Sequence, residues 1–234
     1  MKKIAYILFA ATVMITAALT ASAQSEESRQ VSGFDGLASG GPFEVHVKID
    51  GTESLKIKAS TEAINEIETV VKDGTLRIKF KDHRNWNSRN FGRIDIYVTA
   101  KRLSSLANAG SGSIKVDGTV TGSKVSISLS GSGNVSTSVK AGDFHVAISG
   151  SGSVDLTGSA DETKVSIAGS GDMNGKRFTT NAASVSIAGS GNANLGAEKS
   201  ISASIVGSGN VYYSGSATIS DTRTVGSGRV SRVN

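Results

Sequence analysis

Residues 146–154 read Val-Ala-Ile-Ser-Gly-Ser-Gly-Ser-Val, and this stretch decides the fold because variants of it recur along the second half of the chain. The Gly-Ser-Gly triplet occurs seven times, at intervals of 21, 19, 19, 20, 18 and 19 residues. Such a period is typical of solenoid proteins, in which each repeat stacks on its neighbours. The glycines expected at the corners are Gly110, Gly112, Gly131, Gly133, Gly150, Gly152, Gly169, Gly171, Gly189, Gly191, Gly207, Gly209, Gly226 and Gly228.

The residues around each triplet alternate between apolar and polar side chains. The middle copies carry Ile, Val, Leu or Ala four and two positions before the first glycine, as at Val165 and Ile167. A flexible Gly/Ser linker lacks this period-two pattern, which is typical of half-buried strands. Short strands that meet at a glycine corner bury their apolar faces only when the units stack. The sequence therefore predicts an all-β fold, a right-handed single-stranded parallel β-helix (solenoid).

The two ends of the repeat array are expected to differ from its middle. The first copy carries Asn108, and the last carries Thr222 and Thr224, at positions where the middle copies are apolar. Terminal repeats of solenoids are atypical because they face solvent on one side. We therefore expect Asn108 to lie in one end coil and the two threonines in the other.

Residues 24–105 are expected to form β-strands that extend or cap the solenoid. Apolar and polar residues alternate from Phe43 to Asp50 and again from Ile94 to Val98. Asp73 and Gly74 lie between two strand-like segments and predict a two-residue hairpin. Only residues 62–67 suggest a helix, of one or two turns. The repeats then occupy residues 106–234, and we interpret residues 24–234 as one continuous head domain.

The first residues have the order of a secretory signal peptide, residues 1–23. Lys2 and Lys3 precede an apolar run from Ile4 to about Leu19, and a small-x-small site ends at Ala23, after which we expect cleavage. The chain has no cysteine, which excludes disulfides and a lipidated cysteine anchor. The mature protein is predicted to be exported to the periplasm, the cell surface or the extracellular space, with no transmembrane segment.

The charge of the chain argues against one class of partner. The formal net charge of +5 falls to +3 when Lys2 and Lys3 leave with the signal peptide. Acidic residues are interspersed among the basic ones, whereas a nucleic-acid-binding protein concentrates its basic residues in a stripe or patch. We therefore expect no nucleic-acid partner.

Several motifs resemble those of the auto-transporter adhesin head GIN domain family of exported bacterial proteins. They are Phe34-Asp35-Gly36-Leu37, Gly41-Pro42-Phe43-Glu44-Val45, Asp73-Gly74-Thr75-Leu76-Arg77-Ile78 and the Gly-Ser-Gly series, and together they cover about residues 31 to 214. The resemblance implies a single-stranded β-helix similar to pectin-lyase-like folds and a role in cell adhesion. It implies no catalytic residues that could be transferred to this chain. Nothing after Gly209 resembles a membrane anchor.

The glycine and histidine patterns predict neither a cofactor nor a metal. The triplets lack the third glycine of the dinucleotide fingerprint. His46, His83 and His145 stand apart in the sequence, without metal-ligand spacing. Calcium-binding nonapeptide repeats need a recurrent aspartate, but only Asp172 follows a triplet directly. The other copies carry mostly Ser or Asn at that position, which suggests a hydrogen-bonded ladder.

Acidic residues give no catalytic pair either, and we predict no catalytic residues. Glycoside hydrolysis commonly needs two carboxylates 5 to 10 Å apart, hence acidic residues at matching positions of stacked repeats. Asp117, Asp155 and Asp172 lie seven, five and three residues after their glycines and do not match. A nucleophile elbow with its strand-to-helix context is also missing.

The segment from Lys81 to Arg93 interrupts the strand pattern and holds the one tryptophan of the chain. Exposed Trp and Arg are typical anchors of binding surfaces, because indole stacks on sugars or cations and guanidinium pairs with carboxylate or sulfate. A hairpin loop whose tryptophan folds back onto the sheet is the alternative. The predicted ligand-binding residues are Arg84, Trp86, Arg89, Phe91 and Arg93.

Together these patterns predict a non-catalytic, exported binding or adhesion protein. Its expected partners are glycans or host or cell-surface proteins, and a homo-oligomer stays open. Tyr212 and Tyr213 are a competing aromatic patch, although Tyr213 falls at an apolar repeat position. One alternative is a carbohydrate-active β-helix enzyme, a polysaccharide lyase or hydrolase. The other is a structural envelope protein without a ligand.

Overall fold

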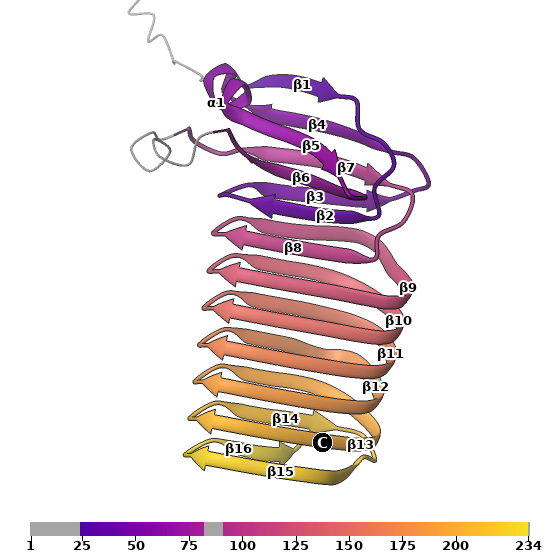
Figure 1. Cartoon of the computed structure of the whole chain (residues 1–234), viewed down its shortest axis with the longest axis vertical. Coiled ribbons are helices and arrows are strands. Elements are labelled where there is room, and N and C mark those ends of the chain that lie inside the picture. Colours follow the sequence, from indigo (N-terminus) through magenta and orange to yellow (C-terminus); the bar gives the residue numbers. More distant parts are fainter. Residues whose placement is uncertain (1–23, 82–90, 234) are drawn as a thin grey trace, which may run out of the picture.

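The strands of the chain stack into a column of coils (Figure 1). The computed structural model describes residues 24–81 and 91–233. Within these residues the elements are β1 (Ser25–Arg29), β2 (Gly36–Gly40), β3 (Glu44–Ile49), β4 (Ser54–Ala59), α1 (Thr61–Glu66), β5 (Ile67–Lys72), β6 (Thr75–Phe80), β7 (Asp95–Ala100), β8 (Ser105–Gly110), β9 (Ser113–Gly131), β10 (Asn134–Gly150), β11 (Ser153–Gly169), β12 (Asp172–Gly189), β13 (Asn192–Gly207), β14 (Asn210–Ser214), β15 (Thr218–Gly226) and β16 (Arg229–Arg232).

The long strands β9 to β13 each follow most of one coil and pair in parallel with the coils on either side. Equivalent residues of successive repeats lie next to each other, so that Val146 pairs with Val165, and Val165 with Val185. These side chains are buried in the interior of the column. The predicted parallel β-solenoid is therefore confirmed, with about seven turns.

Both glycines of each corner are required by the stacking. The first has positive φ in every triplet, for example +114° at Gly169, where a Cβ would lie 2.5 Å from the carbonyl oxygen of Gly150. The second is confined by packing, because a Cβ on Gly171 would lie 2.6 Å from the carbonyl oxygen of Gly152. Real Cβ atoms essentially never come within 3.0 Å of such atoms. A larger residue would therefore push the coils apart at the corner.

The N-terminal coils do not follow their order in the sequence. β2 and β3 form one coil, and the amide of Gly112 in the next corner donates a hydrogen bond to the carbonyl oxygen of Gly41. β2 pairs in parallel with β6 and β8, and β3 pairs in parallel with β7 and β9. The coil of β2 and β3 thus lies between that of β6 and β7 and the first Gly-Ser-Gly coil.

The prediction that Asn108 lies in an end coil is wrong. Asn108 pairs with Ser39 of β2 on one side and with Leu129 on the other, and it is 1% exposed. Its side-chain amide donates a 2.7 Å hydrogen bond to the carbonyl oxygen of Gly112. The polar side chain therefore braces the first Gly-Ser-Gly corner from inside the column.

Antiparallel strands close the N-terminal end of the column. β5 and β6 form the predicted hairpin, with φ of +51° at Asp73 and +70° at Gly74. β4 pairs antiparallel with β7, and β1 pairs antiparallel with β4. The expected short helix is α1, which begins after the N-cap Ser60. This end therefore departs from the solenoid pattern, as capping strands do.

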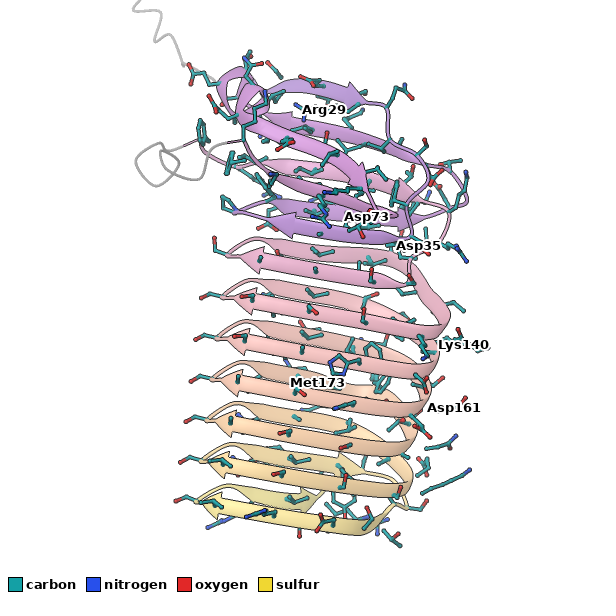
Figure 2. The ribbon with its side chains drawn as sticks, in the orientation of Figure 1. Arg29, Asp35, Asp73, Lys140, Asp161 and Met173 are labelled. Atoms are coloured by element: carbon teal, nitrogen blue, oxygen red, sulfur yellow. The ribbon has the colours of Figure 1, made fainter. Side chains whose placement is uncertain are left out.

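Arg29 of β1 lies among these capping elements (Figure 2). Its guanidinium donates hydrogen bonds to the carbonyl oxygens of Ile64 and Ile67, at 2.9 and 2.8 Å. Ile67 is the first residue of β5, the outer strand of its hairpin. The side chain thus satisfies backbone acceptors at the N-terminal end that no further coil covers.

The C-terminal end is formed by β15 and β16, which pair in parallel with β13 and β14. Every residue of β15 is exposed. Thr222 and Thr224 pair with the buried Ala203 and Ile205, and so occupy inward positions. The prediction that these threonines belong to an end coil is confirmed.

The assignment of inward and outward positions can be tested at neighbouring residues. Ile167 is 2% exposed, whereas the next side chain, Ser166, is partly exposed on the outer face. We expect Ile167→Asp to lower the free energy of unfolding by about 3–5 kcal/mol, because it places an unpaired charge in the core. Ser166→Asp should change it by less than about 1 kcal/mol. Equal effects in chemical denaturation would contradict the assignment.

Candidate functional site

Of the predicted ligand-binding loop, the structure describes Lys81 and residues 91–93. Arg84, Trp86 and Arg89 lie outside the described residues. Phe91 is partly buried and stacks on Phe80, with ring centroids 5.4 Å apart. Phe80 in turn packs against Phe43 in the core. The ring of Phe91 therefore anchors the loop to the column.

Arg93 belongs to a charged cluster on the outer face of β3 and β7. Its guanidinium donates hydrogen bonds to both carboxylate oxygens of Asp95, at 2.9 to 3.0 Å. The ring nitrogen Nε2 of His46 lies 3.2 Å from Oδ1 of the same carboxylate. The ring of His46 also stacks on Tyr97, with centroids 5.0 Å apart. Three residues of two adjacent strands and Arg93, which precedes β7, thus form one cluster.

The pKa of Asp95 lies below its ordinary value. Burial by itself disfavours the carboxylate and raises the pKa, because the side chain is only 8% exposed. Hydrogen bonds and charge from Arg93 and His46 stabilise the carboxylate and outweigh burial. Asp95 is therefore ionised at neutral pH and holds Arg93 against the sheet.

This lowered pKa predicts a pH-dependent contribution to stability. A carboxyl whose pKa falls on folding stabilises the fold above its unfolded pKa of about 3.9, and this contribution is lost as pH falls through the folded pKa. We expect Asp95→Asn to lower the free energy of unfolding at pH 7 by about 1–3 kcal/mol. The difference from the unmodified protein should shrink below about pH 4. Denaturant titrations across pH measure this.

Asp117→Asn is the matched control, since Asp117 is exposed. It should change stability by less than about 0.5 kcal/mol at either pH. A pH-independent effect of Asp95→Asn would contradict the role given to the ionised carboxylate.

A ladder of polar side chains follows the corners along the column. The hydroxyl of Ser153 donates to Oδ1 of Asn134, and the amides of Asn192 and Asn210 donate to Asp172 and Asn192. The ladder expected from the Ser and Asn residues is therefore confirmed in two stretches, from Asn134 to Ser153 and from Asp172 to Asn210. Because its members bond to one another, we interpret it as reinforcement of the stack.

A groove of about 820 Å³ lies along the column, on the outer face of the strands that lead into the corners. Val125 and Phe144 point into the core, so their neighbours along the strand point outward into the groove. Two columns of outward residues line it. One contains Lys124, Asp143, Glu162, Ala182 and Ser200, and the other contains Ser105, Ser126, His145, Lys164, Ser184 and Ser202.

The middle of the groove carries its charges. Lys124, Asp143 and Glu162 follow one another on adjacent coils, and His145 pairs with Lys164 beside them. All five side chains are exposed, and none forms an ion pair with another residue in 24–81 or 91–233. Hydroxyl groups line both ends. The groove therefore offers free hydrogen-bonding groups of both charges to an extended molecule.

The sequence contained a signal for this groove that the search for acidic pairs missed. Asp143 and Glu162 both lie seven residues before the first glycine of their triplets, and they are register partners. The aspartates considered after the triplets lie elsewhere: Asp155 accepts a hydrogen bond from Asn174, and Asp172 one from Asn192. Aligning the residues before each Gly-Ser-Gly triplet, as well as those after it, reveals the pair of Asp143 and Glu162.

The remaining candidates add no other site. Tyr213 is buried, which leaves Tyr212 as the one accessible member of that aromatic patch. The described part of the chain has no group of three or more His, Asp or Glu side chains that could hold a metal ion. It also has no helix with the length and apolar character needed to cross a bilayer.

The fold is a parallel β-solenoid with a groove along its outer face. The chain belongs to the family described as "Putative auto-transporter adhesin, head GIN domain", whose model matches residues 33–217. The resemblance indicated by the sequence motifs is thereby confirmed. No curated protein is significantly similar to the chain.

Solved structures share the whole architecture. A putative adhesin from Bacteroides fragilis is 24% identical, with a TM-score of 0.82 over 90% of this chain and 97% of that one. A putative lipid binding protein from Parabacteroides distasonis is 22% identical, with a TM-score of 0.71 over the same shares. A putative adhesin from Parabacteroides merdae is 20% identical, with a TM-score of 0.70 over 90% and 96%. At identities of 20–24%, the similarity shows that the chain shares the fold of these proteins.

Proposed function

We propose that this protein is an exported, non-catalytic adhesion protein that binds an extended glycan along the groove. Membership of an adhesin family supports the general role. The signal-peptide pattern of residues 1–23 supports export to the periplasm, the cell surface or the extracellular space. The groove, whose central charges form no ion pair within residues 24–81 and 91–233, is the observation that carries the choice of site.

The groove suits a polymer of sugar units for two reasons. Adjacent coils repeat the same positions about 4.8 Å apart, which is close to the length of one unit in an extended polysaccharide. Serine hydroxyls donate and accept hydrogen bonds, as sugar hydroxyls do. Lys124 and Lys164 would pair with carboxylate or sulfate substituents, while Asp143 and Glu162 would accept bonds from neutral hydroxyls.

The groove lysines provide the first test of this function. We expect the double variant Lys124→Ser, Lys164→Ser to lose about tenfold or more in affinity for acidic polysaccharides, since two charge-assisted contacts are removed. Binding to glycan arrays and titration calorimetry on the hits measure the loss. Lys72→Ser, Lys140→Ser is the matched control, with the same charge change at exposed lysines outside the groove. Lys140 projects from the edge of the column (Figure 2). Equal losses in both variants would contradict a groove site.

A carbohydrate-active enzyme is the second candidate, and the register of Asp143 and Glu162 favours it. Carboxylates on adjacent strands meet the requirement for a pair at short separation. The same polysaccharides should therefore be assayed for released reducing ends or unsaturated products. Product formation that Asp143→Asn or Glu162→Gln abolishes would replace the adhesion proposal with catalysis.

The loop from Lys81 to Arg93 stays a separate predicted contact. Arg93 is 67% exposed even while bonded to Asp95, and Tyr97 beside it is 44% exposed. We expect the double variant Trp86→Ala, Arg89→Ala to keep its circular dichroism spectrum and to bind the same ligands more weakly. Unchanged binding would remove the loop and leave the groove as the contact surface.

A further inference from the structure

The C-terminal end of the column presents an unprotected strand edge. β15 pairs with β13 on one side, and none of the described residues pairs with its other side. All nine of its residues are exposed, including Val225 at 57% and Ile219 at 48%. Free edges with unpaired backbone groups are templates for pairing with another strand. The bottom of the column in Figure 1 is thus open, whereas β1, β4, β5 and α1 cover the top.

The charges at the centre of this edge are complementary when two copies of β15 run antiparallel. Residues 219–225 read Ile-Ser-Asp-Thr-Arg-Thr-Val, with Thr222 at the centre. In an antiparallel pair of two such strands centred on Thr222, Asp221 of each copy lies opposite Arg223 of the other. β15 has a bulge at Ser220, so this complementary pairing is confined to residues 221–223. Opposite charges across antiparallel strands are stabilising.

We propose that two copies of this protein join end to end through β15, related by a two-fold axis through Thr222. The inference is independent of the glycan proposal. Opposite residues of two antiparallel strands form either a hydrogen-bonded or a non-hydrogen-bonded pair, and a two-fold axis can pass through both kinds. The pairing is therefore possible whether or not the backbone N–H and C=O groups of Thr222 point toward the free edge. Asp221 and Arg223 pair with Ser202 and Ser204, both on the outer face, so the two new ion pairs form on the surface of a continuous sheet.

The other end of the molecule favours this closed dimer over an open chain of copies. A head-to-tail contact repeats without limit, whereas a two-fold contact closes. Head-to-tail stacking would have to bring β15 against β5, where the guanidinium of Arg29 already bonds to the carbonyl oxygen of Ile67. The capped N-terminal end therefore leaves the C-terminal edge as the surface for self-association.

The positive charge of Arg232 opposes the contact and allows a second test of it. Arg232 pairs with the buried Tyr213 and so occupies an inward position. Thr222 lies four residues before Gly226, and Arg232 lies four after Gly228. The axis through Thr222 therefore passes close to Arg232, and the two copies of this side chain approach each other. Arg232→Ser should tighten the dimer.

Charge exchange on β15 tests the proposal. In sedimentation equilibrium of the purified exported protein, we expect a concentration-dependent monomer–dimer equilibrium. Asp221→Arg and Arg223→Asp, made singly, each place two like-charged pairs in the contact and should weaken it about tenfold. The double variant Asp221→Arg, Arg223→Asp restores opposite charges and should restore the dimer.

Circular dichroism and thermal unfolding of the monomers check that all variants fold alike. A protein that is monomeric at its highest soluble concentration overturns the proposal. So does a double variant as weak as the single ones, because the charges would then not face each other. Open-ended assemblies larger than a dimer would also overturn it.

Discussion

At each Gly-Ser-Gly corner the backbone of one coil lies directly against the backbone of the next, with no side chain between them. The amide of Ser170 donates a 2.9 Å hydrogen bond to the carbonyl oxygen of Gly150, and bonds from the amide of the serine or of the second glycine link the other corners. This contact fixes the spacing of the coils and their register at one edge. Every column of equivalent residues, inside or outside, follows from that register.

The outer surface uses these columns in two ways. Near the corners, side chains such as Asn134 and Ser153 bond to one another and reinforce the stack. In the groove the charged side chains of adjacent coils have no such partners among the described residues, and their hydrogen-bonding capacity is free. One architecture thus supplies both reinforcement and a groove with free polar groups, and the difference lies only in which residue types occupy equivalent positions.

Much of the fold could be predicted from the sequence because repetition makes local patterns unambiguous. Alternation around the triplets identified the buried residues, and Asp73-Gly74 identified the hairpin. The order of the N-terminal coils could not be predicted, for two reasons. The β2–β3 coil turns at Gly40 and Gly41 without the Gly-Ser-Gly triplet. Strand partners that are distant in the sequence also leave no local signal. Asn108 was misplaced for that reason. The groove depends on register across the stack, which only a full alignment of the repeats reveals.

Because the coils stack in register, a complete coil can be removed or added without changing the register of the others. Removing residues 150–168 would join Ser149 to Gly169 and leave every remaining inward residue facing inward, because these residues span one full repeat. Removing a single residue within a strand would instead turn the apolar side chains beyond it outward. Loss or gain of one whole repeat therefore keeps the register of the column and changes the length of the groove by one strand spacing.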